Sequence, residues 1–327
     1  MSDNQLTCKI CNSNSNFQIL KVREMYFGTR EVFDYLECTN CGCLQLLNPP
    51  NDYSSHYPKD YFTFQQKHEG KIKSFLNRFR DKAAMGEKSF LGNILYKKFG
   101  EPTYITRLKI VGVGLKNSIL DVGCGKGILL HKMKESGFEN ILGIDPFIDE
   151  TISYPNGLKI LKKDFNELDG KFDFIMFNHS FEHMESPLEV MKHSNKLLNK
   201  NKFLLIRIPV ADSYAFRTYR ENWSSLDAPR HLFLYTKKSI KILAEQSGFE
   251  IKKISYDSRS WQLWGSEQYS KNISLLDEKS YYTNPDKSIF TKKEIDEFEL
   301  KVIELNKNGE GDQAEFYLQK VSEVTSA

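Results

Sequence analysis

Residues 119–127, with the sequence ILDVGCGKG, decide the fold of this chain. Apolar residues lead into Asp121, glycines then occupy alternate positions, and the apolar stretch 128–133 that follows fits a helix. The pattern predicts a buried strand that turns tightly into a helix, because glycine lets the backbone adopt positive φ angles and approach a ligand closely. Several cofactors use a loop of this kind, so the segments that follow it must indicate which one is bound.

The chain after residue 117 alternates between strand-like and helix-like segments. Such alternation predicts an α/β fold with a Rossmann-like, doubly wound and mostly parallel sheet, whose ligands bind outside the carboxyl ends of the strands. Gly137 and Gly248 fit helix ends, where a left-handed residue is favoured. We expect strands at 118–122, 140–144, 158–162, 172–177, 203–208 and 250–255, and helices at 127–136, 187–198 and 236–247.

Polar residues follow successive predicted strands. Asp145 ends the second strand, about 20 residues after the glycine loop, where a carboxylate accepts hydrogen bonds from both hydroxyls of a ribose. Asp164 follows the third strand, where its carboxylate could face an adenine amino group. A nicotinamide dinucleotide would need glycine at the sixth place of its motif, but Ile128 stands there. The loop therefore favours a nucleoside cofactor that has no pyrophosphate.

The series resembles the class I S-adenosylmethionine-dependent methyltransferases over roughly residues 115–255. The resemblance implies that the methionine end of the cofactor lies at the acid and glycines of the loop, and that Asp145 binds the ribose. It also implies that the adenine lies at Asp164 and Phe165, and that Asn178 faces the sulfonium. The residues expected at the methionine end are Asp121, Gly123, Gly125 and Gly127.

The N-terminal segment contains five of the six cysteines within its first 43 residues. Two C-x-x-C pairs flank the strand-like segments 17–22 and 32–37. Such turns can each direct two thiolates at one Zn²⁺ ion, which would supply much of the folding free energy of so small a unit. We therefore expect a zinc-ribbon-like module whose ligands are Cys8, Cys11, Cys38 and Cys41, with Cys43 left over; reduced structural thiols are the alternative.

A second resemblance concerns the subgroup. The Glu182-His183 pair precedes a proline-opened helix, and 227–233 reads DAPRHLF. Together with the cysteine pairs, these motifs resemble sugar and natural-product methyltransferases that carry an N-terminal zinc-binding domain. The resemblance implies a sugar or nucleotide-linked sugar as acceptor, in polysaccharide or natural-product biosynthesis, with O-methylation favoured over C- or N-methylation.

The transfer step requires alignment of the acceptor and, for a hydroxyl, a base near its oxygen. Histidine suits that role near neutral pH. His183 follows the fourth strand, and His231 lies in an insertion at 210–235, which the fold places on the substrate side. Both are candidate catalytic residues, and a structural role is the alternative for each. Arg230 could clamp an anion or form a structural ion pair, and the aromatic residues of the insertion, such as Phe216 and Trp223, could face a sugar ring or form a small core.

Four regions follow from these patterns. Residues 1–50 form the zinc-binding module, 51–115 a helical linker or lid with an aromatic cluster, 116–260 the methyltransferase core, and 261–327 a mostly helical extension. We expect the extension to contain helices at 291–305 and 313–321. The aromatic cluster consists of Tyr53, Tyr57, Tyr61, Phe62 and Phe64.

Composition limits the remaining possibilities. The 327 residues carry a net charge of only +3 without a basic block, so no nucleic-acid partner is favoured. No apolar run approaches the roughly 18 residues of a membrane span, and we expect a cytoplasmic protein. A protein or RNA methyltransferase, or a non-catalytic S-adenosylmethionine-binding protein of the same fold, are the alternatives; the oligomeric state cannot be predicted.

Overall fold

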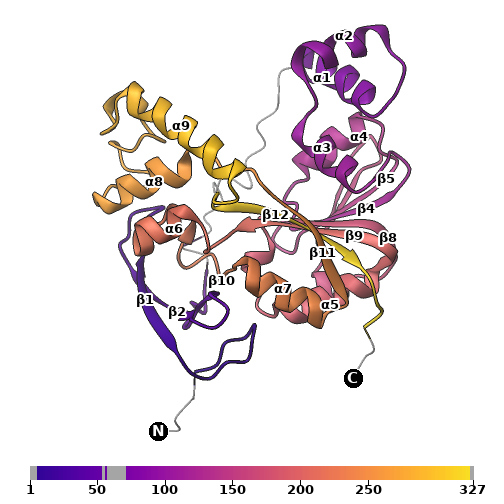
Figure 1. Ribbon diagram of the computed structural model, residues 1–327. Helices are drawn as coiled ribbons and strands as arrows, with labels where there is room; N and C mark the ends of the chain where they lie inside the picture. Colours follow the sequence, from indigo (N-terminus) through magenta and orange to yellow (C-terminus); the bar gives the residue numbers. More distant parts are fainter. Residues whose placement is uncertain (1–5, 54–55, 57–70, 325–327) are drawn as a thin grey trace. The chain divides into compact units, whose positions relative to one another are not determined.

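The structure is a computed structural model, and it describes residues 6–53, 56 and 71–324 (Figure 1). The chain forms two compact units. One unit comprises residues 1–56, 179–191 and 206–316, and the other comprises 57–178, 192–205 and 317–327. None of the helices within the described residues is both long and apolar enough to cross a lipid bilayer.

The main sheet has eight strands in the order β11-β12-β9-β8-β4-β5-β7-β6. Its central pairs, β4 with β5, β4 with β8 and β5 with β7, are parallel, and the short β6 pairs antiparallel with β7 at the edge. The predicted α/β fold with a mostly parallel sheet is therefore confirmed. The strands are β4 (Ser118–Val122), β5 (Asn140–Ile144), β6 (Ile152–Ser153), β7 (Lys159–Leu161), β8 (Phe172–Asn178), β9 (Leu198–Pro209), β11 (Phe249–Tyr256) and β12 (Gln313–Lys320).

Helices pack on this sheet through apolar faces. Leu130 and Met133 of α4 are buried with Ile119 of β4 and Phe174 of β8 in one core cluster. The close approach of α4 to β5 depends on Gly143, because a Cβ atom there would lie 2.5 Å from the sulfur of Cys124 and 2.7 Å from Leu130. The helices are α1 (Lys71–Ala84), α2 (Phe90–Phe99), α3 (Thr103–Ile110), α4 (Ile128–Glu135), α5 (Pro187–Leu197), α6 (Tyr214–Tyr219), α7 (Lys237–Gln246), α8 (Trp261–Ser270) and α9 (Lys292–Lys307).

A second, four-stranded sheet has the order β1-β2-β3-β10. The strands β1 (Phe17–Arg23) and β2 (Val32–Cys38) occupy the predicted positions, and β3 (Leu44–Leu46) continues the antiparallel ladder. The fourth strand, β10 (Phe233–Leu234), comes from the 210–235 insertion and pairs with β3. The N-terminal module is thus completed by residues almost 200 positions further along the chain, a contact that local sequence patterns do not reveal.

The prediction of a final helix at residues 313–321 is wrong. Residues 313–321 contain β12 instead, which lies between β11 and β9 in the sheet. Five consecutive residues, from Ala314 to Leu318, are buried, as in a strand covered on both faces. Short apolar runs of this kind fit a buried strand and a helix equally well by periodicity. The helix expected at 291–305 is present as α9, and the region 71–110 is helical as predicted.

Candidate functional site

The loop after β4 has the backbone that its glycines suggested. Gly123, Gly125 and Gly127 have φ angles of 73°, 55° and 74°, in the left-handed region that glycine enters without strain. Gly127 is also the residue from which α4 begins. The three glycines therefore turn β4 into α4 while keeping the backbone of the loop free of side chains.

Asp145 is directed at this loop from the end of β5. One carboxylate oxygen, Oδ2, accepts a hydrogen bond of 2.9 Å from the backbone N–H of Gly125, and the other, Oδ1, accepts one of 2.8 Å from Phe147. The carboxylate is buried and held in a single orientation. Each oxygen has two lone pairs, so the group can still accept hydrogen bonds from ligand hydroxyls.

Asp121 is a buried carboxyl group at the end of β4. Its Oδ1 lies 3.4 Å from the amide nitrogen of Asn178, at the end of the neighbouring β8. Burial raises the pKa of Asp121 to about 7, and the negative charge of Asp145 adds to this, whereas the hydrogen bond from Asn178 opposes it. A cation bound beside Asp121 would lower this pKa again.

The pair expected at the adenine has a mainly local role in the structure. Asp164 is exposed and accepts a hydrogen bond from the backbone of Asn166, so it caps a short 3-10 helix. Phe165 is buried, and its ring meets those of Phe177 and His193 edge-on. Their assignment to the adenine stays a prediction.

Two further residues near this site, Phe147 and Arg107, belong to none of the motifs in the sequence. Phe147 is 80% exposed and follows Asp145 by two positions, so an exposed aromatic side chain stands beside the buried acid. Arg107 of α3 and Asn178 are polar residues in the lining of a small pocket, whose other walls come from α3, α4, β8 and β9. The place of Phe147, two residues after Asp145, is a signal that the sequence contains, whereas no motif marks Arg107.

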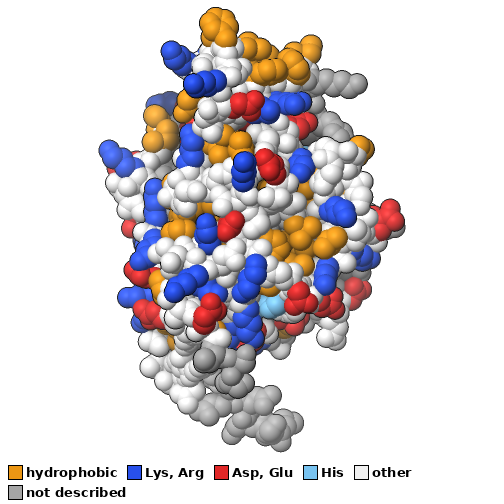
Figure 2. All heavy atoms as spheres, turned by 90° about the vertical axis from the view of Figure 1, so that its right-hand side faces the viewer, with side chains coloured by type: hydrophobic (Ala, Val, Ile, Leu, Met, Phe, Trp, Pro, Cys, Tyr) orange, Lys and Arg blue, Asp and Glu red, His pale blue; other side chains and the backbone are white. Residues whose placement is uncertain are grey.

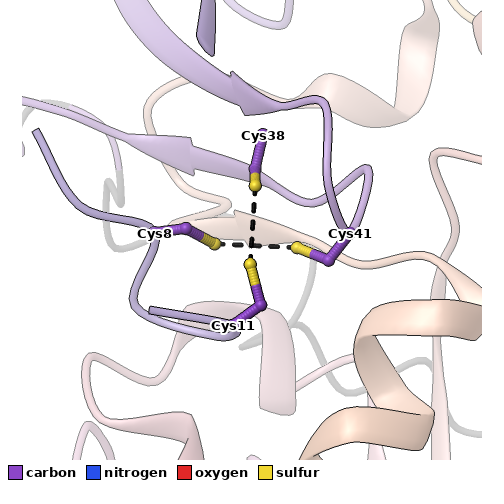
Figure 3. A group of neighbouring side chains, drawn as sticks. All are labelled: Cys8, Cys11, Cys38 and Cys41. Carbon is purple, nitrogen blue, oxygen red and sulfur yellow. Dashed lines mark hydrogen bonds between the residues drawn. The ribbon is translucent and has the colours of Figure 1, made fainter. Parts of the chain in front are cut away.

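The four predicted cysteines come together in the structure (Figure 3). One sulfur atom from each lies within 4.8 Å of the others, and the pairs Cys8–Cys41 and Cys11–Cys38 are each 3.6 Å apart. A tetrahedral zinc ion with Zn–S bonds of about 2.3 Å has sulfurs about 3.8 Å apart, so the cluster matches a tetrathiolate site. Cys43 stands outside it, as expected, and its thiol donates to the carbonyl of Leu44.

The cysteine cluster is tied to the insertion that carries His231. The hydroxyl of Thr236, at the start of α7, donates a 2.6 Å hydrogen bond to the carbonyl of Cys41. Tyr35 of β2 donates one of 2.7 Å to the carbonyl of His231. The N–H of Leu46 donates to the carbonyl of Leu232 over 2.9 Å. The N-terminal module therefore fixes the backbone on both sides of His231.

The candidate catalytic histidines lie together, beside Glu182. Their rings are 4.9 Å apart, and Nε2 of His231 lies 3.9 Å from Glu182 Oε1. Burial lowers the pKa of His231 to about 4 despite the nearby Asp227, so its imidazole is neutral at pH 7. Burial alone would raise the pKa of Glu182, but His179, His183 and His231 outweigh it and lower this pKa to about 2. Glu182 is therefore an ionised carboxylate.

Other polar and aromatic residues of the insertion have structural roles. Arg230 is buried, forms ion pairs with Asp227 and Glu24, and lies over the ring of Tyr26. Phe216 and Trp223 are buried in one apolar cluster and contact each other. For Arg230, the structure shows the structural ion pair and not an anion clamp. For Phe216 and Trp223, it shows the small apolar core and not a surface that faces a sugar ring.

Comparison with known proteins places the chain in a family. A family model described as a methyltransferase domain matches residues 64–254, more than half of the chain. The chain belongs to this family, and it is an S-adenosylmethionine-dependent methyltransferase. The glycine loop, Asp121 and Asp145 all lie within the matched region.

Individual relatives are more distant. A mitochondrial ubiquinone biosynthesis O-methyltransferase of Saccharomyces cerevisiae is 30% identical over 105 residues, which are 27% of this chain and 32% of the yeast protein. The match thus spans about a third of that relative. Similar solved structures include the cyclopropane synthase MmaA2 of Mycobacterium tuberculosis, with 13% identity and a TM-score of 0.43 over 78% of this chain and 100% of the other. A methyltransferase of Archaeoglobus fulgidus has 20% identity and a TM-score of 0.39 over 69% and 98%.

Proposed function

We propose that this enzyme transfers the methyl group of S-adenosylmethionine to a hydroxyl oxygen of a small polar acceptor, with a sugar or nucleotide-linked sugar as the class. Two observations support the proposal: a cofactor-type loop in one compact unit, and a polar histidine–carboxylate cluster in the other. The yeast relative is an O-methyltransferase, which supports an oxygen acceptor.

The chain's residues fit the cofactor. An amino-acid end carries an ammonium and a carboxylate, and Asp121 and Arg107 offer the opposite charges around Asn178. We assign the methionine end to Asp121, Arg107 and the three glycines. Asp145 then accepts the ribose hydroxyls, for which its fixed carboxylate keeps acceptor capacity.

The remaining cofactor contacts follow from this orientation. Asn178 faces the sulfonium, because it ends β8 beside Asp121. Asp164 and Phe165 contact the adenine, and we add Phe147, whose exposed ring can cover one face of the base. The bound cofactor would supply an electrophilic methyl group on a sulfonium, so the protein has to align the acceptor and exclude water.

We place His231 and His183 on the acceptor side of the reaction. In the transfer, the acceptor O–H bond breaks, an O–C bond forms, and the S–C bond of the sulfonium breaks to leave a neutral thioether. A neutral imidazole can accept the hydrogen bond of the acceptor hydroxyl and assist loss of its proton. The neutral state of His231 at pH 7 supports this role.

A pocket next to this cluster supports a polar acceptor. It is lined by Arg23, Tyr26, Glu221, Asp227 and Tyr269, among others. Asp227 links the pocket to the cluster, since its Oδ2 lies 3.9 Å from Nε2 of His231. Charged and aromatic side chains of this kind suit a hydroxylated ring.

The cysteine cluster would bind a structural zinc ion. Four thiolates leave no position open for a substrate, as is usual for zinc sites that stabilise a fold. The hydrogen bonds from Thr236 and Tyr35 connect this module to the insertion. Zinc would therefore help to position His231 without entering the reaction.

A mutation of His231 tests the acceptor side separately from the cofactor side. We expect His231→Ala to lower turnover by at least about 100-fold, while the affinity for S-adenosylmethionine changes little. Transfer of labelled methyl groups to a panel of nucleotide sugars and polyols would measure turnover. Unchanged turnover in the variant would remove His231 from the reaction.

The alternatives predict other outcomes. A protein or RNA methyltransferase would label cell-extracted protein or RNA but no small molecule. The intermixed acidic and basic side chains in Figure 2 do not favour RNA. A non-catalytic protein would bind S-adenosylmethionine and label nothing.

A further inference from the structure

Glu182, His183 and His231 form a second group of potential metal ligands, separate from the cysteines. One ligand atom from each residue lies within 4.8 Å of the others. Glu182 and His183 belong to a short 3-10 helix at residues 181–183, and His231 comes from the insertion. The N–H of Leu232, next to His231, donates a 2.9 Å hydrogen bond to the carbonyl of Glu182, which joins the two segments.

The carboxylate of Glu182 is fully buried and has unused acceptor capacity. Neither of its oxygens has a hydrogen-bond partner among the residues that the structure describes. The nearest ring nitrogens are His179 Nδ1 at 3.4 Å and His231 Nε2 at 3.9 Å from Oε1. A buried charge without hydrogen bonds is costly unless a cation compensates it.

Both histidines are oriented by backbone carbonyls. Nδ1 of His183 lies 2.7 Å from the carbonyl oxygen of Arg230, and Nδ1 of His231 lies 2.9 Å from that of Ser225. A carbonyl only accepts, so each Nδ1 carries a proton, and Nε2 is the ring atom whose lone pair can bind a metal. Metal-binding histidines are usually held in this way, with the second nitrogen donating to a carbonyl or carboxylate.

The backbone around the cluster is also strained. His179, three residues before Glu182, and Asp227, four residues before His231, have φ angles of 54° and 43°. Residues other than glycine rarely adopt this left-handed backbone conformation. Backbone strain of this kind is found at functional sites more often than elsewhere.

We propose that Glu182, His183 and His231 bind one divalent first-row transition-metal ion, such as Zn²⁺, Fe²⁺ or Mn²⁺. Two imidazoles and one carboxylate suit these ions, whereas Mg²⁺ and Ca²⁺ prefer oxygen ligands alone. Two ligands at 2.0–2.1 Å on a tetrahedral ion are about 3.4 Å apart, so the 3.9 Å between His231 and Glu182 needs to shorten only slightly. Asp227 remains outside, because Arg230 binds both of its oxygens.

The proposed metal ion would also take part in methyl transfer, and this catalytic role rests on the proposed function. Three protein ligands leave coordination positions open, and an acceptor hydroxyl can take one of them. With the metal bound, Nε2 of each histidine is a ligand, so His183 and His231 act through the metal and no longer as bases. The metal favours the alkoxide, and the released proton passes to solvent or to a neighbouring base. The alkoxide oxygen then forms the O–C bond as the S–C bond of the sulfonium breaks, so the step needs no further reactant.

Metal binding tests the site without any assay of activity. The full chain, with its cysteine site loaded with zinc, is dialysed against a mild chelator and titrated with Co²⁺. We expect one added equivalent, with visible absorption typical of nitrogen and oxygen ligands and without thiolate-to-cobalt charge transfer. Glu182→Gln and His231→Gln should each weaken Co²⁺ affinity by at least about 100-fold, since even changes next to the ligands cost 10–100-fold.

His131→Gln is the matched control. His131 lies on α4, is half-buried against the ring of Tyr154, and is far from the cluster in the sequence. It should keep the affinity of the unchanged chain. Absence of a second equivalent, or equal affinity in all the variants, overturns the site. Circular dichroism and zinc content show whether a variant has folded, and an unfolded Glu182→Gln leaves His231→Gln to decide.

The role of the metal is decided by a second measurement. Removal of the second metal should lower methyl transfer at least about 100-fold and leave S-adenosylmethionine affinity unchanged, and Mn²⁺ or Fe²⁺ should restore transfer. Transfer that continues without the metal overturns this role. A chain that binds the metal but not S-adenosylmethionine would instead overturn the proposed function and leave the metal site standing.

Discussion

Asp121 and Asp145 are two buried carboxyl groups at the ends of the neighbouring strands β4 and β5. Asp145 is held in one orientation by the N–H groups of Gly125 and Phe147. Within the part of the chain that the structure describes, Asp121 has the amide of Asn178 at 3.4 Å as its hydrogen-bond partner, and burial raises its pKa to about 7. The two acids therefore have different tasks: Asp145 presents a fixed carboxylate, whereas Asp121 is ready to be charged by a bound cation.

The raised pKa of Asp121 predicts a pH-dependent affinity for the cofactor. The free protein keeps this group protonated below pH 7, and the ammonium of S-adenosylmethionine favours the ionised form, so binding releases a proton. Affinity should rise by up to about tenfold per pH unit between pH 5.5 and 7 and level off above it. Calorimetry in buffers of different ionisation enthalpy measures both effects, and Asp121→Asn should flatten the profile. A profile that stays the same in the variant would contradict the assignment.

The raised pKa of Asp121 also makes the stability of the fold depend on pH, but in the opposite direction to cofactor affinity. The folded state binds more protons at Asp121 than the unfolded state between about pH 4 and pH 7, so this group's contribution to stability falls as the pH rises through that window. Bound cofactor should reduce this loss, because it restores a partner to the charged carboxylate.

Asp145→Ala should weaken S-adenosylmethionine binding by about 100-fold or more, because two hydrogen bonds from ribose hydroxyls to a charged group contribute roughly 1.5–3 kcal/mol each. The fold should remain, as circular dichroism would show. Asp169→Ala, which changes an exposed acid in the same unit, is the control. An affinity in Asp145→Ala equal to that of the control would remove the ribose assignment.

At the level of elements, the sequence is most informative where spacing is local. The C-x-x-C pairs and the glycine loop each predicted a feature that the structure contains, because both depend on a few consecutive residues. The pairing of β10 with β3 could not be predicted, since it joins residues 44–45 to 233–234. Likewise, an Arg or Trp in an insertion suits a ligand site or a core, and only the fold shows that Arg230 and Trp223 are buried.

The cysteine cluster should hold the four-stranded sheet together. We expect Cys38→Ser with Cys41→Ser to lose the bound zinc and to unfold residues 8–46, because so small a module depends on its metal. Elemental analysis measures the zinc, and hydrogen exchange measures the opening of β1, β2 and β10. Cys43→Ala, at a buried cysteine outside the cluster, should retain one zinc ion per chain. A zinc-free double variant with an unchanged exchange pattern would contradict the account.

The strand β12 should be a main support of its sheet. Phe316 is completely buried, so Phe316→Ala should lower the free energy of unfolding by about 3–5 kcal/mol. Leu300→Ala, on the exposed side of α9, should change it by no more than about 0.5 kcal/mol. Denaturant unfolding of both variants measures the difference. Equal effects would argue against an interior position for β12.

For the whole molecule, the candidate functional residues divide between the two compact units. The glycine loop, Asp121, Asp145, Asp164 and Asn178 belong to one unit. The cysteine cluster, Glu182, His183 and His231 belong to the other. The chain joins the two sets directly, because Asn178 ends β8 and His183 follows five residues later. This division agrees with one unit that binds the methyl donor and another that selects the acceptor.

The most direct test of this account is calorimetric titration of the full chain with S-adenosylmethionine and with S-adenosylhomocysteine. We predict saturable binding of one molecule of either compound per chain, which Asp145→Ala weakens by about 100-fold or more without loss of fold. Absence of binding by a correctly folded, zinc-loaded chain would contradict the central claim that residues 119–127 hold this cofactor.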